Sequence, residues 1–515
     1  MLPVAGKLEP CRKGEKKMGI RKTAVIVCVL VLASSGLVEG KKGENTKIYT
    51  AFVSGGVQHF ESKLLKSTTN EELLHKLRSE CDGVDFVVGS SDHNIEHIKE
   101  NFDGVLTFGG MSDYSIALTG LPTIVVYNFP EFLHIPHALF LSKGKILTAC
   151  LDRANTCSES ISSRMFGDLV EKIKLIQALK KMKESRILLV TDGVVADYFG
   201  GHRRDLHYVS EGDIRLKKDY EEIFLDIVEK SLGTKVTKIG IEEVSSDEQI
   251  RKIWIDENER EAEEIARKWI AEAKSMKDTI KSEVVKSAKL YLAMKVLMEK
   301  YNATAIAFHL RSLVKNPRRE DRVWPSLGDS ELQKHGIVAC CQAHTNVVLT
   351  HMLAQYAFGR PSMMGDYIVD PFNDVIIVMH CGAPWNPYGD DRRVPYIIRD
   401  HAERGISGHS KPGVGACSEV LFPVNEPVTI WRIDVLRKEI LVHTGTTVSG
   451  YSLYKDFAYL MCRSKLVAKV DAKKVQSHAY QDNWGVHKTV TFGDHRERIK
   501  DLATLMGYEV IEEDK

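Results

Sequence analysis

Four polar side chains in the last third of the chain have residue types that could bind a metal ion or move protons. They are Gln342, Asp366, His380 and His487. A carboxylate and two imidazoles make a hard oxygen-and-nitrogen donor set that suits Mn²⁺ or a similar ion. Such an ion polarises a carbonyl or alkoxide oxygen, and a nearby carboxylate can then transfer a proton.

A structural interpretation of the same residues stays open on spacing alone. His380 would cap a strand, Asp366 would belong to a Gly-Asp turn, and His487 would be a surface histidine. Scattered groups of this kind are not a motif by themselves.

The elements around these residues would place them at strand ends. An apolar strand at 336–341 precedes Gln342, and a helical pattern follows it. Gly365-Asp366 then opens a second strand, whose hairpin partner at 375–379 ends on His380. Strand ends hold side chains on a rigid scaffold facing an open cleft, so chemistry is expected there.

The rest of the chain predicts an α/β protein with a β-rich end. Short β-branched runs bounded by Gly, Pro and Asp alternate with helical patterns up to about residue 180, and a similar unit starts at 186. That alternation is typical of parallel sheets with helices on their faces. After about residue 366, strand runs with frequent Pro and Gly replace long helices.

We therefore predict two Rossmann-like parallel-sheet α/β domains followed by an antiparallel β-rich C-terminal domain. The expected boundaries are a signal-like leader at 1–44, an N-terminal α/β domain at 45–184, a second α/β domain at 185–357 and the β-rich domain at 358–515. Within the second domain, a charged pattern from about 259 to 301 predicts one long helix with a solvated face.

The leader has a basic head, about ten apolar residues and a small-residue exit, which is a secretory signal pattern. Its apolar run is too short to span a bilayer, so the mature chain is expected to have no stable membrane span. We expect a secreted or periplasmic protein if the leader is used, and a cytoplasmic one otherwise.

Composition narrows the function classes. A net charge of +1 provides no whole-chain field for nucleic acid. The ten cysteines form no CxxC pair, which leaves a zinc ribbon or thioredoxin-type site unsupported. The chain also lacks the GxGxxG fingerprint of an α/β dehydrogenase.

The segment 338–381 resembles the L-fucose isomerase and L-arabinose isomerase superfamily. Members show a strand ending in Ala-Cys-Glu-x-Asp, a Leu-rich helix with a Gly, a Gly-Asp pair and then His-Cys-Gly. The matching residues here are Cys340 or Ala339, Cys341, Gln342, Ala343 and His344, then Gly359, Gly365-Asp366 and His380-Cys381-Gly382. The tail is similar too, with His487, Gly493-Asp494 and Leu505-Met506-Gly507 at the corresponding places.

The resemblance implies a metal-dependent aldose–ketose isomerase that works through an enediol. It implies a divalent metal, usually Mn²⁺, a small sugar as substrate and a homo-oligomer. Asp366 would be a metal ligand and acid/base group, His487 a metal ligand, and His380 a ligand or sugar contact. Asn483 and Trp484 would contact sugar hydroxyls.

The chain departs from the family at the strand end. The family's Glu, a metal ligand and proton-transfer base, is Gln342 here, and the following Asp is His344. A carboxamide can offer oxygen to a metal, but it cannot accept a proton at pH 7. His344 could replace it as ligand or base, because an unperturbed imidazole titrates near neutrality.

Two further functions therefore stay open. The first is a catalytically impaired carbohydrate-binding protein on the same scaffold. The second is a different metal-assisted reaction that uses His344, such as hydrolysis or epimerisation.

Overall fold

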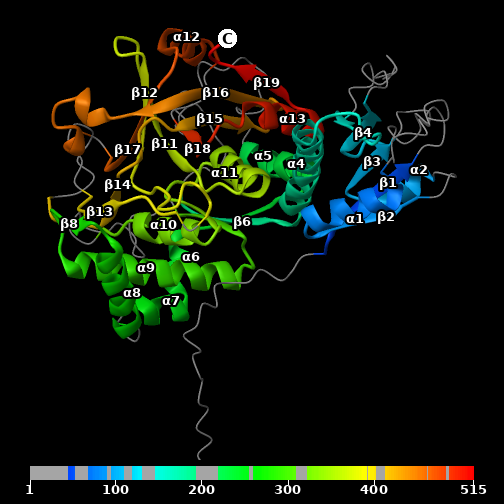
Figure 1. The fold of residues 1–515 in the computed structure, drawn as a ribbon. Helices are drawn as coiled ribbons and strands as arrows, with labels where there is room; N and C mark the ends of the chain where they lie inside the picture. Colours follow the sequence, from blue (N-terminus) through cyan, green and yellow to red (C-terminus); the bar gives the residue numbers. More distant parts are fainter. Residues whose placement is uncertain are drawn as a thin grey trace, which may run out of the picture. The chain divides into compact units, whose positions relative to one another are not determined.

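The computed structural model (Figure 1) describes most of the chain from Glu44 to Lys515, and residues 40–515 cluster as one compact unit. The expected leader lies outside the described residues apart from its last position, and so do Asn483 and Trp484. The described ranges are 44–52, 68–89, 94–108, 119–129, 145–192, 219–254, 259–308, 322–390, 392–401, 412–460, 462–482 and 487–515.

A parallel sheet forms the first part of the described chain, as the strand–helix alternation predicts. Its strand order is β2-β1-β3-β4-β5 within the described ranges. Helix α1 starts with a capping box, in which the Thr69 hydroxyl accepts from the Glu72 N–H and the Glu72 carboxylate accepts from the Thr69 N–H. The elements are β1 (Thr46–Phe52), α1 (Asn70–Glu80), β2 (Val84–Val88), α2 (Ile95–Asn101), β3 (Gly104–Phe108), β4 (Thr123–Asn128), β5 (Ile146–Leu151) and α4 (Glu159–Glu184).

A second parallel sheet has the order β10-β9-β6-β7 among the described strands. The expectation of parallel α/β layers is thus confirmed for this part of the chain. Its elements and the helices around it are β6 (Arg186–Val190), α5 (Tyr220–Leu232), β7 (Lys235–Ile239), α6 (Ile241–Ser246), α7 (Glu248–Trp254), β9 (Ala305–Phe308), α10 (Ser326–Lys334), β10 (Val338–Cys340) and α11 (Thr345–Phe358).

The long helix expected at 259–301 is wrong. The structure has two helices, α8 (Glu259–Glu272) and α9 (Lys281–Lys300), with the short strand β8 (Ser275–Met276) between them. Strand β8 pairs in parallel with β13 (Tyr396–Arg399), so a tertiary contact breaks the helix where the local sequence does not. The expected solvated face is also wrong for α9, because most of its side chains are buried.

The C-terminal sheet is antiparallel except for one pair, which confirms the predicted β-rich end. Its order is β15-β18-β11-β12-β17-β16-β19 among the described strands, and β16 and β19 run in parallel. Strands β13 and β14 belong to a separate small sheet with β8. The remaining elements are β11 (Met363–Asp370), β12 (Val375–His380), β14 (Cys417–Val420), β15 (Pro427–Asp434), β16 (Glu439–Val448), η7 (Gly450–Ser452), η8 (Phe457–Tyr459), β17 (Ser464–Lys469), α12 (Ala472–Asp482), β18 (His487–Phe492), α13 (Arg496–Met506) and β19 (Glu509–Glu512).

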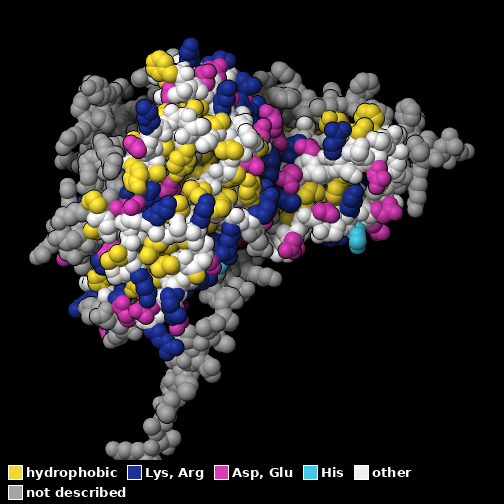
Figure 2. All heavy atoms as spheres, turned by 60° about the vertical axis from the view of Figure 1, so that its left-hand side comes forward, with side chains coloured by type: hydrophobic (Ala, Val, Ile, Leu, Met, Phe, Trp, Pro, Cys, Tyr) yellow, Lys and Arg dark blue, Asp and Glu magenta, His cyan; other side chains and the backbone are white. Residues whose placement is uncertain are grey.

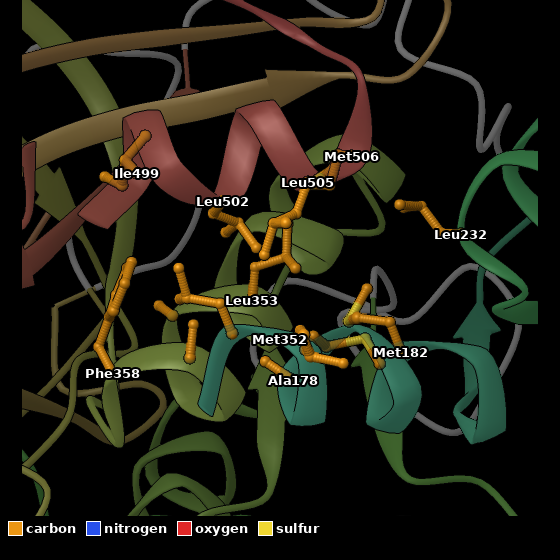
Figure 3. Packing of buried hydrophobic residues seen from close by; sticks show 14 of the residues in the cluster. Ala178, Met182, Leu232, Met352, Leu353, Phe358, Ile499, Leu502, Leu505 and Met506 are labelled. Atoms are coloured by element: carbon orange, nitrogen blue, oxygen red, sulfur yellow. The ribbon is translucent and has the colours of Figure 1, made fainter. Parts of the chain in front are cut away.

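Helix α11 lies between the C-terminal sheet and helix α4. It packs on β15 and β18 and against α4, while α13 also contacts α4. Figure 3 shows Met352 and Leu353 of α11 between Ala178 of α4 and Leu505 of α13. Full burial of each such aliphatic side chain contributes about 1.5–3 kcal/mol, so this interface holds α11 firmly against the sheet.

The surface carries charges of both signs. On the face shown in Figure 2, Lys and Arg side chains are interleaved with Asp and Glu, and hydrophobic patches lie among them. Within the described ranges, no helix combines the length and apolar character needed to cross a bilayer.

Candidate functional site

Asp366 and His487 are cross-strand neighbours in the C-terminal sheet. Strands β11 and β18 run antiparallel with Asp366 opposite His487. The Asp366 Oδ1 and His487 Nε2 atoms are 3.2 Å apart, and the side chains are 37% and 6% exposed. His487 is therefore not a surface histidine, and solvent reaches the pair from the carboxylate side.

Gly365 sets how closely strand β12 approaches beside Asp366. A Cβ atom at position 365 would lie 2.7 Å from the Met379 carbonyl oxygen and 2.8 Å from its nitrogen. Only glycine fits this close backbone contact without a shift of one strand. Asp366 lies inside β11 rather than at its start, so the expected Gly-Asp turn is wrong.

Gln342 and His344 lie in the connection between β10 and α11. Strand β10 ends at Cys340, one residue before the end of the predicted strand at 336–341, and His344 is the N-cap of α11. The His344 Nε2 atom is 2.8 Å from the Gln342 Oε1 atom. Because an amide oxygen only accepts, Nε2 carries the hydrogen and the lone pair of a neutral His344 ring is on Nδ1.

His344 also lies close to the Asp366–His487 pair. The centroids of the His344 and His487 rings are 4.5 Å apart, with an angle of 32° between the ring planes. The fold thus gathers Gln342, His344, Asp366 and His487 from three separate stretches of the chain.

His380 joins this group but has a close partner of its own. Its ring centroid is 5.8 Å from that of His487, and its Nδ1 atom is 2.8 Å from the Cys341 Sγ atom. Burial, followed by the nearby Asp329 carboxylate, raises the pKa of the Cys341 thiol well above its usual range. The thiol therefore donates to Nδ1, so His380 would reach a metal ion through its Nε2 atom.

The donor types fit a hard divalent ion, although the donors are not preassembled as a cage. Within the described part of the chain, no three His, Cys, Asp or Glu side chains already form a group able to hold a metal ion. The Asp366 carboxylate, the His487 imidazole and the Gln342 amide oxygen nevertheless match the ligands that Mn²⁺ accepts.

Two supporting contacts were missed in the sequence. The Arg432 guanidinium donates to the His487 carbonyl oxygen at 3.0 Å and holds the start of β18. Behind the site, burial followed by His380 lowers the pKa of His351 to about 3. Its Nδ1 atom is 3.9 Å from the Cys340 Sγ atom. The sequence carries no signal for either contact, because the first depends on how the distant strands β15 and β18 align and the second on how α11 packs against β10.

Comparison with known proteins assigns no family to the chain. No family model matches it, and no curated protein does. One similar solved structure is described as a putative two-component system response regulator/GGDEF domain protein. It is 12% identical, covers 53% of this chain and 85% of its own, and has a TM-score of 0.19. A similarity of that size carries no argument about fold or function.

Proposed function

We propose that the chain is a divergent, metal-dependent aldose–ketose isomerase that acts on a small sugar through an enediol intermediate. The observation that supports this function is the 3.2 Å approach of Asp366 Oδ1 and His487 Nε2, with Gln342 and His344 beside them. Metal-assisted proton transfer needs metal ligands and a proton acceptor that a substrate can reach. The carboxylate, imidazole and amide oxygen of this partly exposed site provide these groups.

Asp366, His487 and Gln342 would hold a divalent ion such as Mn²⁺, and His380 could add its Nε2 atom. When bound, the ion would polarise the oxygens of an open-chain sugar and make the adjacent C–H more acidic.

Asp366 is the group that would carry the proton. Its carboxylate is the most exposed part of the Asp366–His487 pair, so a substrate can reach it. It would take the proton from C2 of the sugar and return it at C1. The Gln342 amide cannot accept a proton, and His344 could do so only through Nδ1 while Nε2 remains bound to Gln342.

At a larger scale, we propose that the three main sheets define three domains, at 45–184, 185–357 and 358–515. Asn483 and Trp484 would contact sugar hydroxyls from the segment before β18. We further propose a homo-oligomer, with secretion or export to a periplasm if the leader is used.

A second candidate function is carbohydrate binding without turnover. The Gln342–His344 hydrogen bond favours it, because it ties the two replacement residues to each other. A binder on this scaffold would recognise sugars but would lack the second proton-transfer carboxylate.

Metal analysis and a sugar panel test the isomerase. We expect the purified full chain to bind about one Mn²⁺ and to convert at least one aldose to its ketose. The Asp366→Ala variant should lose both properties, while Glu509→Ala, which removes an exposed carboxylate from the same sheet, should keep them. A folded wild-type chain that binds no divalent ion and yields no ketose from any aldose would contradict an isomerase.

A further inference from the structure

A cavity opens beside strand β17, and neither Asp366 nor His487 lines it. Its volume is about 260 Å³, which is slightly below the range of small-molecule sites. The end of β14 and the residues after it, the end of β16, the turn around η7 and strand β17 line it, and none of the five residues gathered at the candidate site does. The residues that matter here are Glu419, Tyr451, Phe457, Arg463 and Lys465.

The acidic and guanidinium groups around this cavity neutralise one another. Glu419 Oε2 is 2.8 Å from Arg399 Nη1, and the Tyr451 hydroxyl donates to the same carboxylate. The Arg463 guanidinium pairs with Asp400 at 2.5 Å.

Lys465 has a different environment from these pairs. Its Nζ atom donates to the carbonyl oxygens of Cys462 at 2.7 Å and Arg463 at 3.2 Å. It also lies 5.2 Å from the centroid of the Phe457 ring. In the described part of the chain, no carboxylate forms an ion pair with it.

These contacts suit a neutral amine. Two carbonyl acceptors match the two hydrogens of an uncharged amino group and leave its lone pair available. Burial, against the opposing charges of Glu419 and Cys462 and with help from Arg463 and Arg399, lowers the pKa of Lys465 to about 8. A desolvated lysine near other cations is the usual form of a nucleophilic lysine.

The strand register separates Lys465 from the candidate site. Asp366 pairs with Met379 on β12, and Met379 pairs with Lys465 on β17. Lys465 is thus two strands away from Asp366 in one row, with the buried Met379 side chain between them. Chemistry at Lys465 would not involve the Asp366 carboxylate.

We propose that Lys465 is the nucleophile of a separate site that captures small aldehydes or ketones as imines. The Nζ lone pair attacks the carbonyl carbon, and the carbonyl π electrons move to oxygen. A first proton moves from nitrogen to that oxygen and gives a carbinolamine. The second proton of the amine then moves to the hydroxyl, water leaves, and a C=N bond to Nζ forms. The Tyr451 hydroxyl and the Glu419 carboxylate line the same cavity and can relay these protons.

The cavity limits the class of compound. Its volume suits a carbonyl compound of a few carbon atoms, and Phe457 with Val448 and Leu466 provides an apolar wall. The Glu419 charge is already neutralised by Arg399, so neither a strongly anionic nor a cationic compound is favoured.

Reductive trapping tests this site. The full chain would be incubated with glyceraldehyde and cyanoborohydride at about pH 8, digested and mapped by mass spectrometry. We expect the Lys465 peptide to be labelled roughly tenfold faster than that of Lys469, an exposed lysine on the same strand, because a lower pKa leaves more neutral amine. The Lys465→Arg variant should lose this label, whereas Lys469→Arg and Asp366→Ala should retain it.

A denatured sample separates a cavity effect from simple reactivity. In urea, the preference for Lys465 over Lys469 should disappear, and this comparison does not depend on whether Lys465→Arg folds. Equal labelling of both lysines in the native chain, or no label at Lys465, would overturn the proposed site. If the Asp366→Ala variant still labels at Lys465, the Lys465 site does not depend on the isomerase function.

Discussion

Gln342 is the residue that distinguishes the two candidate functions, the isomerase and the carbohydrate-binding protein. Its amide oxygen binds His344 and cannot take up a proton. Replacing it by Glu keeps the length of the side chain and adds a carboxylate next to Asp366 and His487.

For Gln342→Glu we expect aldose–ketose conversion to increase by about 10²–10⁴, the usual contribution of a positioned general base. Ketose formation with Mn²⁺ present measures it, and Gln355→Glu on α11 serves as a matched control for the added charge. A folded Gln342→Glu variant that binds metal and sugar but stays inert would favour the binding protein instead.

Glu513 is a second residue whose charge matters, on the opposite side of strand β18 from His487. It is fully buried between Lys488 and the His443 Nδ1 atom, which is 2.6 Å from its Oε2 atom. Burial opposes its ionisation, but Lys488 and His443 hold the pKa of Glu513 below its ordinary value.

The Glu513→Gln variant should lower the free energy of unfolding by about 3–5 kcal/mol, because it leaves the buried Lys488 charge unpaired. Urea denaturation followed by fluorescence measures the loss. Glu509→Gln, an exposed change on β19 just before Glu513, should alter stability by about 0.5 kcal/mol or less. If Glu513→Gln lowers the free energy of unfolding by only about 0.5 kcal/mol, the Glu513 carboxylate does not hold Lys488.

At the scale of elements, the connection between β5 and α4 depends on one side chain. The Asp152 carboxylate accepts from the N–H groups of Thr156 and Cys157 at 2.8 Å and 2.7 Å, and from the hydroxyls of Thr156 and Ser162, each at 2.9 Å. Burial opposes its ionisation, but these hydrogen bonds lower the pKa of Asp152.

The Asp152→Ala variant should destabilise the chain by about 1–3 kcal/mol, because it leaves part-buried donors without an acceptor. Thermal denaturation measures this, and Ser162→Ala should cost about 1 kcal/mol, since it removes one donor and leaves the carboxylate satisfied. Equal effects of the two changes would show that the carboxylate does not organise the connection.

Strands β2, β3, β4 and β5 of the first sheet could be predicted because each is a β-branched run between turn residues, whereas β1 was not singled out. Strands β13 and β14 were missed because each has only four residues, and β17 was missed because it forms by pairing with the distant strand β12. The break between α8 and α9 has the same cause. Strand β13 pairs with Ser275 and Met276, whose local sequence pattern predicts a helix.

The candidate site was predictable in its residues but not in its geometry. The types of Asp366, His380 and His487 indicate metal or proton chemistry, whereas their approach follows from strand register, which no local pattern encodes. The Cys341–His380 contact was missed for a different reason, since a cysteine in an apolar strand usually is a small buried hydrophobe.

At the scale of the whole molecule, buried imidazoles should make the chain sensitive to acid. Burial lowers the pKa of His351 to about 3 and that of His495 to about 4, and it also lowers the pKa of His443. The unfolded chain binds protons at these positions below about pH 6.5, while the folded chain does not. Stability is therefore present above that pH and is lost as the pH falls.

Between about pH 6 and pH 5, we expect the unfolding free energy to fall by about 2–3 kcal/mol per pH unit from the two protons of His351 and His495, and the lowered pKa of His443 adds to this slope. Urea denaturation at a series of pH values measures the slope. His495→Gln should reduce it by about one proton, whereas the exposed His75→Gln should leave it unchanged. A flat profile through this range would show that these rings already carry protons in the folded chain.

Gly365 gives the sheet an unusual kind of vulnerability. The position of the Asp366 carboxylate depends on the absence of a methyl group one residue earlier, where β11 and β12 touch backbone to backbone. The Gly365→Ala variant would push strands β11 and β12 apart without removing any polar atom from the chain. Such a variant would keep every candidate site residue and still displace the Asp366 carboxylate.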